Sequence, residues 1–274
     1  MQHVNLTAYD NVELLTHYTQ HDFEKYCQAK LESCDKHISF IRGHCVDDAW
    51  QGRVCEIGSG NSKLLYRLEL EGLLEFGTGF EISHSRHTFA EKFRALIGSQ
   101  KVHNQQENVM DVAPVKEMDL IIGVDNILNL IAPLHPTAEQ NILSWIRKGL
   151  RTNGYLILEL WDFVHILKLI ELSDNQQLKI WGEFPQPDQF EFGMYQVSLN
   201  ENQYVVWKKM YLKRNSTERS HFENILKPYT HEKIIKVLKT AGFKHIRIFP
   251  KWNPEEEQVK GEYVVLAKKE ELKI

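Results

Sequence analysis

The stretch that decides the fold is Arg53-Val-Cys-Glu-Ile-Gly-Ser-Gly-Asn-Ser62, an apolar strand that ends in two closely spaced glycines. The spacing of apolar residues in 62–72 predicts a helix directly after it. Glycines at such a junction let the backbone turn tightly and lie close against a ligand. A second unit follows, with a strand at 74–82 and a helix at 85–96. Alternation of this kind predicts a parallel sheet with helices on both faces.

The alternation continues along the chain. The expected elements are a weak strand at 101–103, a strong strand at 118–124, a helix at 137–150, a strand at 155–160, a short helix at 163–172, a helix at 230–241, and strands at 244–249 and 263–267. Thr137-Ala-Glu-Gln140 has the form of a capping box, which marks a helix start. Ahead of the sheet, the apolar spacing from Phe23 to Ile41 predicts one long amphipathic helix. Residues 194–199 and 204–212 flank a polar turn and predict an inserted antiparallel hairpin.

Composition and charge exclude several classes of protein. The chain of 274 residues has a net charge of −4, so it lacks the broad positive field that binds a phosphate backbone, and nucleic acid is not an expected partner. A local basic cluster consists of Lys208, Lys209, Lys213 and Arg214. It favours a solvent-exposed face over the alternative of a binding site for an anionic acceptor. No apolar run approaches the roughly 20 residues of a membrane span, and the N-terminus lacks the features of a signal peptide. The four cysteines form no C-x-x-C pair, which favours reduced thiols and a cytoplasmic location.

Two carboxylates follow the predicted strands. Glu56 lies two residues before the first glycine, where it would meet a cationic or hydrogen-bond-donating ligand. Glu81, in Gly79-Phe-Glu-Ile-Ser83, ends the adjacent strand, where it would accept both hydroxyls of a ribose. The dinucleotide fingerprint requires a third glycine at position 63, which is Lys63 here, so a pyrophosphate ligand is disfavoured.

These motifs resemble those of a known family. Glu56 to Ser62, Gly79 to Ser83 and Asn108-Val-Met-Asp111 are similar, in order and spacing, to successive motifs of class I S-adenosylmethionine-dependent methyltransferases of the small-molecule type. The resemblance implies that Gly58 and Gly60 pass under the methionine moiety of the cofactor S-adenosylmethionine, that Glu81 binds its ribose, and that Asn108 and the Val109 backbone meet its adenine. Tyr9 resembles an N-terminal tyrosine that closes over the methyl donor. Family members often have Asp at position 108, so Asn108 departs from the pattern. The full set expected at the donor is Tyr9, Glu56, Gly58, Ser59, Gly60, Glu81, Ile82, Asn108, Val109 and Asp125.

The fold class is therefore α/β, a doubly wound, mostly parallel seven-stranded sheet of the Rossmann-like methyltransferase type, with an inserted antiparallel hairpin and an N-terminal helical lid. Residues 1–50 are the expected lid segment and 51–172 the cofactor-binding core. Residues 173–228 are the inserted hairpin on the substrate side, and 229–274 complete the core sheet. The chain is expected to act as a monomer or homodimer.

The resemblance implies in-line transfer of a methyl group to N or O of a small amine, amino alcohol or sugar. The candidates for a general base follow strands four and five and are, in order, Asp125, His165 and Asp162. The candidates for acceptor binding are Tyr18, Asn126, Trp161, Tyr195 and Trp207. No metal is expected, although Asp125, Asn126 and Asp162 are also residue types that hold magnesium in catechol-type methyltransferases.

Two other classes of function stay open. A NAD(P)-dependent oxidoreductase would share the sheet and the acid at Glu81, but Lys63 replaces its third glycine. A non-catalytic scaffold would bind the adenosyl ligand without transferring a methyl group. The N-P-P-Y loop of enzymes that methylate amide or base nitrogens is absent, since Val124-Asp-Asn-Ile127 stands in its place, and this disfavours nucleic acid or glutamine as acceptor.

Overall fold

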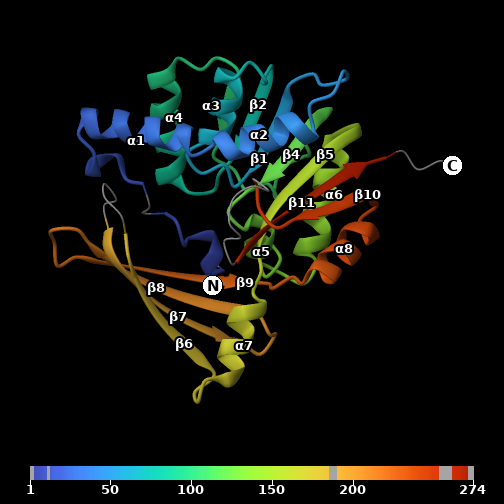
Figure 1. Ribbon diagram of the computed structural model, residues 1–274. Coiled ribbons are helices and arrows are strands. Elements are labelled where there is room, and N and C mark those ends of the chain that lie inside the picture. The colour runs from blue at the N-terminus through green and yellow to red at the C-terminus, as the bar shows by residue number, and fades with distance from the viewer. Residues whose placement is uncertain (1–2, 11–12, 185–189, 253–260, 271–274) are drawn as a thin grey trace.

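A seven-stranded sheet forms the centre of the molecule (Figure 1). The computed structural model describes residues 3–10, 13–184, 190–252 and 261–270. The strand order is β10-β11-β5-β4-β1-β2-β3, in which β1 to β5 are parallel and β11 runs antiparallel to both of its neighbours. The strands are β1 (Arg53–Ile57), β2 (Phe76–Phe80), β3 (Val102–Gln105), β4 (Met118–Gly123), β5 (Leu150–Trp161), β10 (Phe243–Phe249) and β11 (Glu262–Lys269). The predicted α/β class with a mostly parallel seven-stranded sheet is confirmed.

Helices cover both faces of this sheet. On one face lie α1 (Gln20–Glu32), α2 (Asp35–His44), α3 (Lys63–Leu70) and α4 (His84–Ile97), and on the other α5 (Ile127–Ile131), α6 (Ala138–Gly149) and α8 (His231–Thr240). Strand β4 shows why two layers are needed. Leu120 and Ile122 pack into the hydrophobic cluster on the α1–α4 face and Ile121 into the cluster on the face of α5, α6 and α8, and all three are fully buried. A strand that is apolar on both faces has to be covered on both.

Two helix predictions are refined by the structure. The helix predicted from Phe23 to Ile41 is broken into α1 and α2 at Ser33 and Cys34, where the chain contains neither Gly nor Pro to announce a stop. Helix α6 begins directly after Thr137, as the capping box predicts. The Thr137 hydroxyl makes no capping hydrogen bond, because it instead accepts from the side chain of Asn141.

The inserted hairpin is part of a larger second sheet. Strands β7 (Phe190–Leu199) and β8 (Val205–Lys213) are the predicted pair, but β6 (Gln177–Glu183) and β9 (Arg219–Leu226) flank them in a four-stranded antiparallel sheet. The prediction of a single hairpin was therefore wrong in extent. Helix α7 (Val164–Leu172) packs on this sheet through Ile170, which joins Val197, Val205 and Leu226 in a third hydrophobic cluster.

The N-terminal segment, with short 3-10 turns η1 (Val4–Leu6) and η2 (Leu15–His17), lies between the two sheets (Figure 1). The buried side chain of Asn5 joins them. Its amide nitrogen donates to the carbonyl oxygens of Leu130, in α5, and Ile225, in β9, each at 2.7 Å. Its oxygen accepts from the Ile225 N–H at 2.8 Å. One amide thus fixes the distance between the core and the second sheet.

Replacement of Asn5 by alanine should destabilise the fold. It would leave buried backbone groups of Leu130 and Ile225 without partners, at about 3 kcal/mol in free energy of unfolding. Urea denaturation followed by circular dichroism measures this value. Thr7→Ala, in the same segment, removes an exposed hydroxyl that donates at 3.4 Å, and should change the free energy by less than about 0.5 kcal/mol. Equal values for the two variants would contradict the role of Asn5.

No helix in the described ranges is both long enough and apolar enough to cross a membrane.

Candidate active site

A cavity of about 320 Å³ opens at the carboxyl ends of β1, β2 and β4. We call it the glycine-loop cavity. Every residue that the sequence analysis assigns to the donor lines it: Tyr9, Glu56, Gly58, Ser59, Gly60, Glu81, Ile82, Asn108, Val109 and Asp125. Parallel sheets of this kind bind ligands at this edge. The structure thus brings residues of four strand–loop junctions, after β1, β2, β3 and β4, to one place.

The loop after β1 requires glycine for two physical reasons. Gly58 has φ +66°, in the left-handed region, and a Cβ there would lie 2.6 Å from the Ile127 side chain. Gly79, in the neighbouring strand β2, has no space for a Cβ either, which would come within 2.7 Å of the Ser59 hydroxyl. The Ser59 N–H donates to the Phe80 carbonyl oxygen at 3.0 Å. The loop is therefore held against β2, and its backbone faces the cavity.

Glu81 is fixed at the end of β2 by the same loop. Its two carboxylate oxygens accept from the Gly60 N–H at 2.9 Å and from the Ser83 N–H at 2.8 Å. The side chain is buried among its neighbours yet lines the cavity. A carboxylate oxygen can accept more than one hydrogen bond, so Glu81 keeps capacity for donors from a ligand.

Glu56 is a buried acid with an unused oxygen. Its side chain is only 2% exposed, and its Oε2 atom has no hydrogen-bond partner among the described residues. Burial raises the pKa of Glu56 to about 8; nearby Lys63 opposes this shift, and Asp125 and Glu81 add to it. A cationic group in the cavity would favour the ionised form of Glu56 and satisfy the unpartnered oxygen.

The raised pKa of Glu56 predicts a pH-dependent stability. The folded protein holds a proton that the unfolded chain releases above its ordinary pKa of 4.5. The stabilisation is therefore complete below that pH and is lost as pH rises through about 8. We expect Glu56→Gln to raise the melting temperature by several degrees at pH 8.5 and by much less at pH 5.

The melting temperatures of wild type and variant at those two pH values check this. Glu232→Gln, at an exposed acid in the first turn of α8, is the control and should shift neither. A Glu56→Gln effect of equal size at both pH values would show that Glu56 titrates normally.

The turn after β4 has an unusual backbone. Asp125 and Asn126 both adopt the left-handed region, with φ +52° and +65°. Glu159, at the end of β5, holds the turn because its carboxylate accepts from the Asp125 N–H at 2.8 Å and from the indole N–H of Trp252. The Oδ1 atom of Asn126 is buried and has no partner among the described residues. Strained backbone and unpartnered polar atoms of this kind cluster at functional sites.

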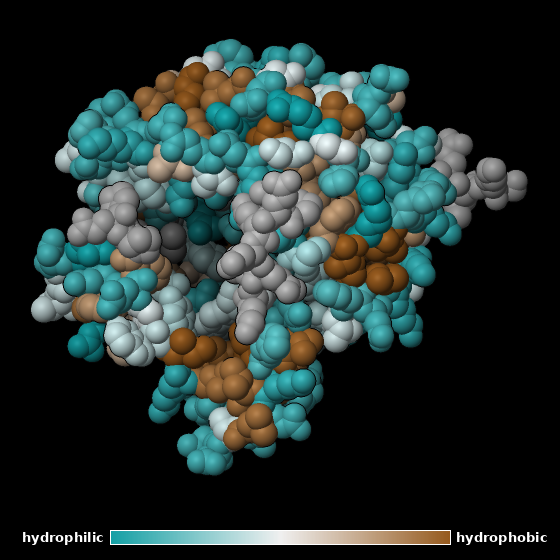
Figure 2. Space-filling view, viewed as in Figure 1, coloured by the Kyte–Doolittle hydropathy of each residue, from teal (hydrophilic) through white to brown (hydrophobic). Residues whose placement is uncertain are grey.

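A second cavity, of about 280 Å³, adjoins the first. We call it the aromatic cavity, because Trp161, Tyr195, Trp207 and Tyr211 line it. The rings of Trp161 and Trp207 lie 4.3 Å apart between centroids. Both cavities share Tyr9, Asp125, Asn126 and Leu130. Figure 2 shows the molecule hollowed between the core and the β6–β9 sheet.

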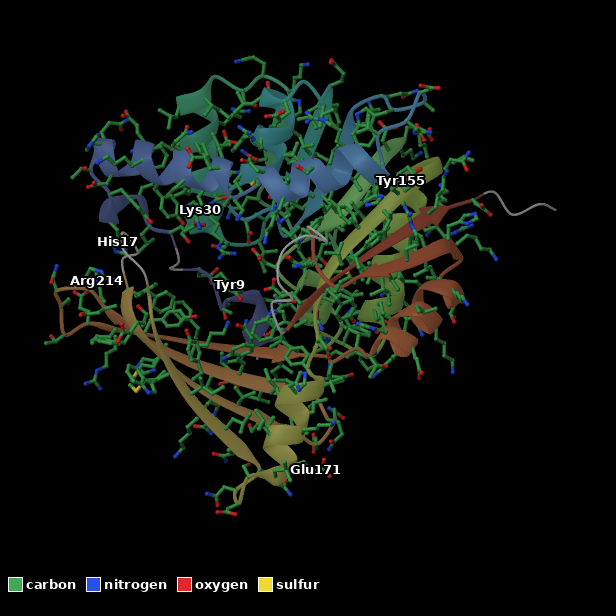
Figure 3. All side chains as sticks on the ribbon, in the orientation of Figure 1. Tyr9, His17, Lys30, Tyr155, Glu171 and Arg214 are labelled. Atoms are coloured by element: carbon green, nitrogen blue, oxygen red, sulfur yellow. The ribbon has the colours of Figure 1, made fainter. Side chains whose placement is uncertain are left out.

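Tyr9 stands where the two cavities meet. Figure 3 shows it between the core and the second sheet. Its hydroxyl donates to the Asn224 side-chain oxygen at 3.3 Å, and its ring centroid lies 4.4 Å from the Arg86 guanidinium. Its carbonyl oxygen accepts from the hydroxyls of Ser83 and Ser85, at the start of α4. The N-terminal segment therefore crosses the site as a strap attached to both sheets.

Three candidates from the sequence lie outside both cavities. Tyr18 packs its ring 5.2 Å from Tyr26 and 5.8 Å from Phe89, in an aromatic cluster under α1 and α4. Asp162 accepts from the Val164 N–H at the start of α7, and His165 is exposed on that helix. The structure therefore does not bring Tyr18, Asp162 or His165 together with the other candidates, and their roles in acceptor binding and catalysis stay predictions. Packing and helix capping account for Tyr18 and Asp162.

Other residues of the two cavities were not among the sequence candidates. Glu13 lines the glycine-loop cavity and accepts from the Asn61 amide at 2.9 Å, with Arg86 at 3.7 Å. Lys209 and Asn224 line the aromatic cavity. Only Lys209 had a signal, because it belongs to the basic cluster in the sequence. Asn224 lies in β9, a strand that the sequence pattern does not reveal.

Comparison with known proteins supports the fold. No protein-family model matches the chain, and no curated protein is similar to it in sequence. Several solved structures are similar to this chain in fold. An S-adenosylmethionine-dependent methyltransferase from Clostridium acetobutylicum has a TM-score of 0.71 at 15% identity, over 91% of this chain and 99% of that one. The CcbJ methyltransferase from Streptomyces caelestis has 0.67 at 12%, over 86% and 89%.

An amino pentose methyltransferase from Micromonospora echinaspora, solved with S-adenosylmethionine bound, has a TM-score of 0.59 at 12% identity. The match covers 92% of this chain and 98% of that one, so the second sheet falls within the similarity as well as the core. The chain therefore has the fold of the class I S-adenosylmethionine-dependent methyltransferases.

Proposed function

We propose that the chain is an S-adenosylmethionine-dependent methyltransferase that transfers a methyl group to N or O of a small molecule. One observation carries the proposal. The glycine-loop cavity, which holds every residue expected at the donor, adjoins the aromatic cavity at Tyr9, Asp125, Asn126 and Leu130. In this proposal residues 51–172 bind the donor, and residues 173–228 supply much of the acceptor wall.

The residues of the glycine-loop cavity fit the donor. The unpartnered Oε2 of Glu56 suits the ammonium of the methionine moiety, and Glu81 suits the ribose hydroxyls. Gly58 leaves the backbone free of a Cβ beside Ile127, so the chain can lie flat against the ligand. Asn108 and buried Val109 line the part of the cavity that would receive the adenine. When bound, S-adenosylmethionine supplies a methyl group on a positively charged sulfur.

The chain's own part in the reaction is to align the acceptor and take its proton. The acceptor would lie in the aromatic cavity with its nucleophile at the Asp125 end, next to the glycine-loop cavity. Asp125, whose backbone Glu159 holds in place, is the carboxylate shared by the two cavities and would receive the proton that the nucleophile loses. Tyr9 and the strap around it would exclude water.

The walls of the aromatic cavity favour a ring or a cation. Indole and phenol faces attract the C–H face of a sugar and the charge of an amine. One of the similar structures is described as an amino pentose methyltransferase, and an amino pentose is both a sugar and an amine. We therefore propose an amine, amino alcohol or sugar as the acceptor.

The proposal is tested by methyl transfer. Purified protein is incubated with donor labelled in its methyl group and with pools of amines, amino alcohols and amino sugars. We expect label in one pool and a stoichiometric amount of S-adenosylhomocysteine. Binding of the donor without transfer to any pool would instead support a non-catalytic scaffold.

A further inference from the structure

Two residues of the β6–β9 sheet that line the aromatic cavity carry hydrogen-bond donors without acceptors. The indole Nε1 of Trp207 and the amide Nδ2 of Asn224 are both buried without a partner among the described residues. Asn224 itself is fully buried, and its side-chain oxygen already accepts from the Tyr9 hydroxyl. Burial removes water from the nitrogen without giving it another hydrogen-bond partner, which is energetically unfavourable.

Lys209 adds a positive charge to these donors. No hydrogen bond or ion pair reaches its ammonium within the described part of the chain, and the ammonium lies 5.2 Å from the centroid of the Trp207 ring and 6.0 Å from that of the Tyr9 ring. Burial, together with the nearby Arg86 guanidinium, lowers the pKa of Lys209 to about 8. A half-buried lysine without a carboxylate beside it is costly, and an anion would relieve that cost.

Strand register places the three side chains together. Trp207 lies directly opposite Asn224 on β9, and Lys209 lies two residues further along β8, opposite Tyr195 on β7. Paired residues and their second neighbours share one face of an antiparallel sheet. All three side chains line the aromatic cavity, and Lys208 between them points to the other face, where it pairs with Glu223 at 4.0 Å.

We propose that Lys209, Trp207 and Asn224 form a binding site for an anionic oxygen group of the acceptor, a carboxylate or a phosphate. The inference rests on the proposed function and narrows its acceptor. Three donors, one of them charged, match an anion with several acceptor oxygens. The nucleophile would lie beside Asp125, which lines the same cavity, so the acceptor carries an anionic group in addition to its amine or hydroxyl.

Matched ligand pairs test this site. The phosphate pair is O-phosphotyramine and tyramine, and the carboxylate pair is para-aminomethylbenzoate and para-methylbenzylamine. Each pair keeps the ring and the amine and differs in the anion at the far end. Calorimetric titration at pH 7, where Lys209 is charged, should show tighter binding of the anionic member in at least one pair, by about tenfold. We call the affinity of the anionic member divided by that of the neutral member the affinity ratio. The pair with the larger affinity ratio identifies the anion.

Variants assign the effect to the site. Lys209→Met should bring the affinity ratio of anionic to neutral ligand near one, and Lys209→Arg should preserve most of this preference. Lys208→Met, on the other face of the same strand, should leave it unchanged. Melting temperatures show whether each variant is folded. If Lys209→Met does not fold, Asn224→Asp is tested in its place. This variant adds a negative charge beside the anion and should reverse the preference for the anionic ligand.

Wild-type ratios near one in both pairs, or no binding of either anionic probe, would overturn the anion site. Equal ratios in wild type and Lys209→Met would do the same. The binding of S-adenosylhomocysteine is measured on the same protein. If it binds while the anion preference is absent, the acceptor site alone is refuted, and if it does not bind, the proposed function fails.

Discussion

Asp125→Asn is expected to lower kcat by about 100-fold while changing the affinity for S-adenosylhomocysteine by less than about twofold. The carboxylate is the acidic group common to the two cavities, at the point where acceptor and donor would meet. General-base catalysis contributes about 100- to 10,000-fold in such reactions. Asparagine keeps the size of the side chain and tolerates the left-handed backbone at φ +52°, so the turn should stay intact. Steady-state rates and calorimetry measure the two quantities separately.

Asp162→Asn and His165→Ala are the matched controls for this variant. Both residues follow β5 and are sequence candidates for the base, but neither side chain lines either cavity. Their kcat should stay within about twofold of wild type. An Asp125→Asn enzyme with a normal kcat would exclude Asp125 as the base. A large loss of kcat in Asp162→Asn would instead point to Asp162, just before α7.

Glu81→Ala is expected to weaken binding of S-adenosylhomocysteine by at least tenfold, or about 1.4 kcal/mol. Two effects add. The variant removes the carboxylate that would accept the ribose hydroxyls, and it frees the Gly60 and Ser83 N–H groups, which are held at 2.9 and 2.8 Å. Isothermal titration calorimetry gives the change directly.

Glu75→Ala is the control for Glu81. Its side chain is 70% exposed at the opposite end of β2, where it pairs with Lys101, and its loss should leave ligand affinity unchanged. If Glu81→Ala bound the ligand as tightly as wild type, the assignment of the ribose site would be wrong.

The glycine-loop cavity is the part of the site that the sequence predicts well. Each of its motifs is a short run in which a strand, a turn and an acid follow one another, such as Gly79 to Ser83. Parallel strands then bring these local junctions to one edge, because their carboxyl ends share it. The topology therefore brings together the residues expected at the donor, and no long-range contact has to be known in advance.

The aromatic cavity is predicted less well because its parts are distant in sequence. Tyr9 and Asn224, which bond to each other, are 215 residues apart, and Asn5 reaches Ile225 across 220. Strand β9, which carries Asn224, lacks a clear alternation of apolar and polar residues, and β6 is exposed over most of its length. Periodicity detects a strand through its buried face, so these two escaped it.

The break between α1 and α2 has a similar explanation. Ser33 is the C-cap of α1 and buried Cys34 is the N-cap of α2, both with an αR backbone, so the apolar spacing runs through the break without interruption. Packing of both helices against the hydrophobic cluster that includes Phe23 and Ile41 fixes the bend, rather than a helix-stopping residue.

The most direct test of the central claim is calorimetric titration of the purified wild-type protein with S-adenosylhomocysteine and, separately, with NAD. The arrangement of Gly58, Glu56 and Glu81 predicts saturable binding of one S-adenosylhomocysteine per chain and no measurable binding of NAD. Binding of NAD with no uptake of S-adenosylhomocysteine would contradict the account.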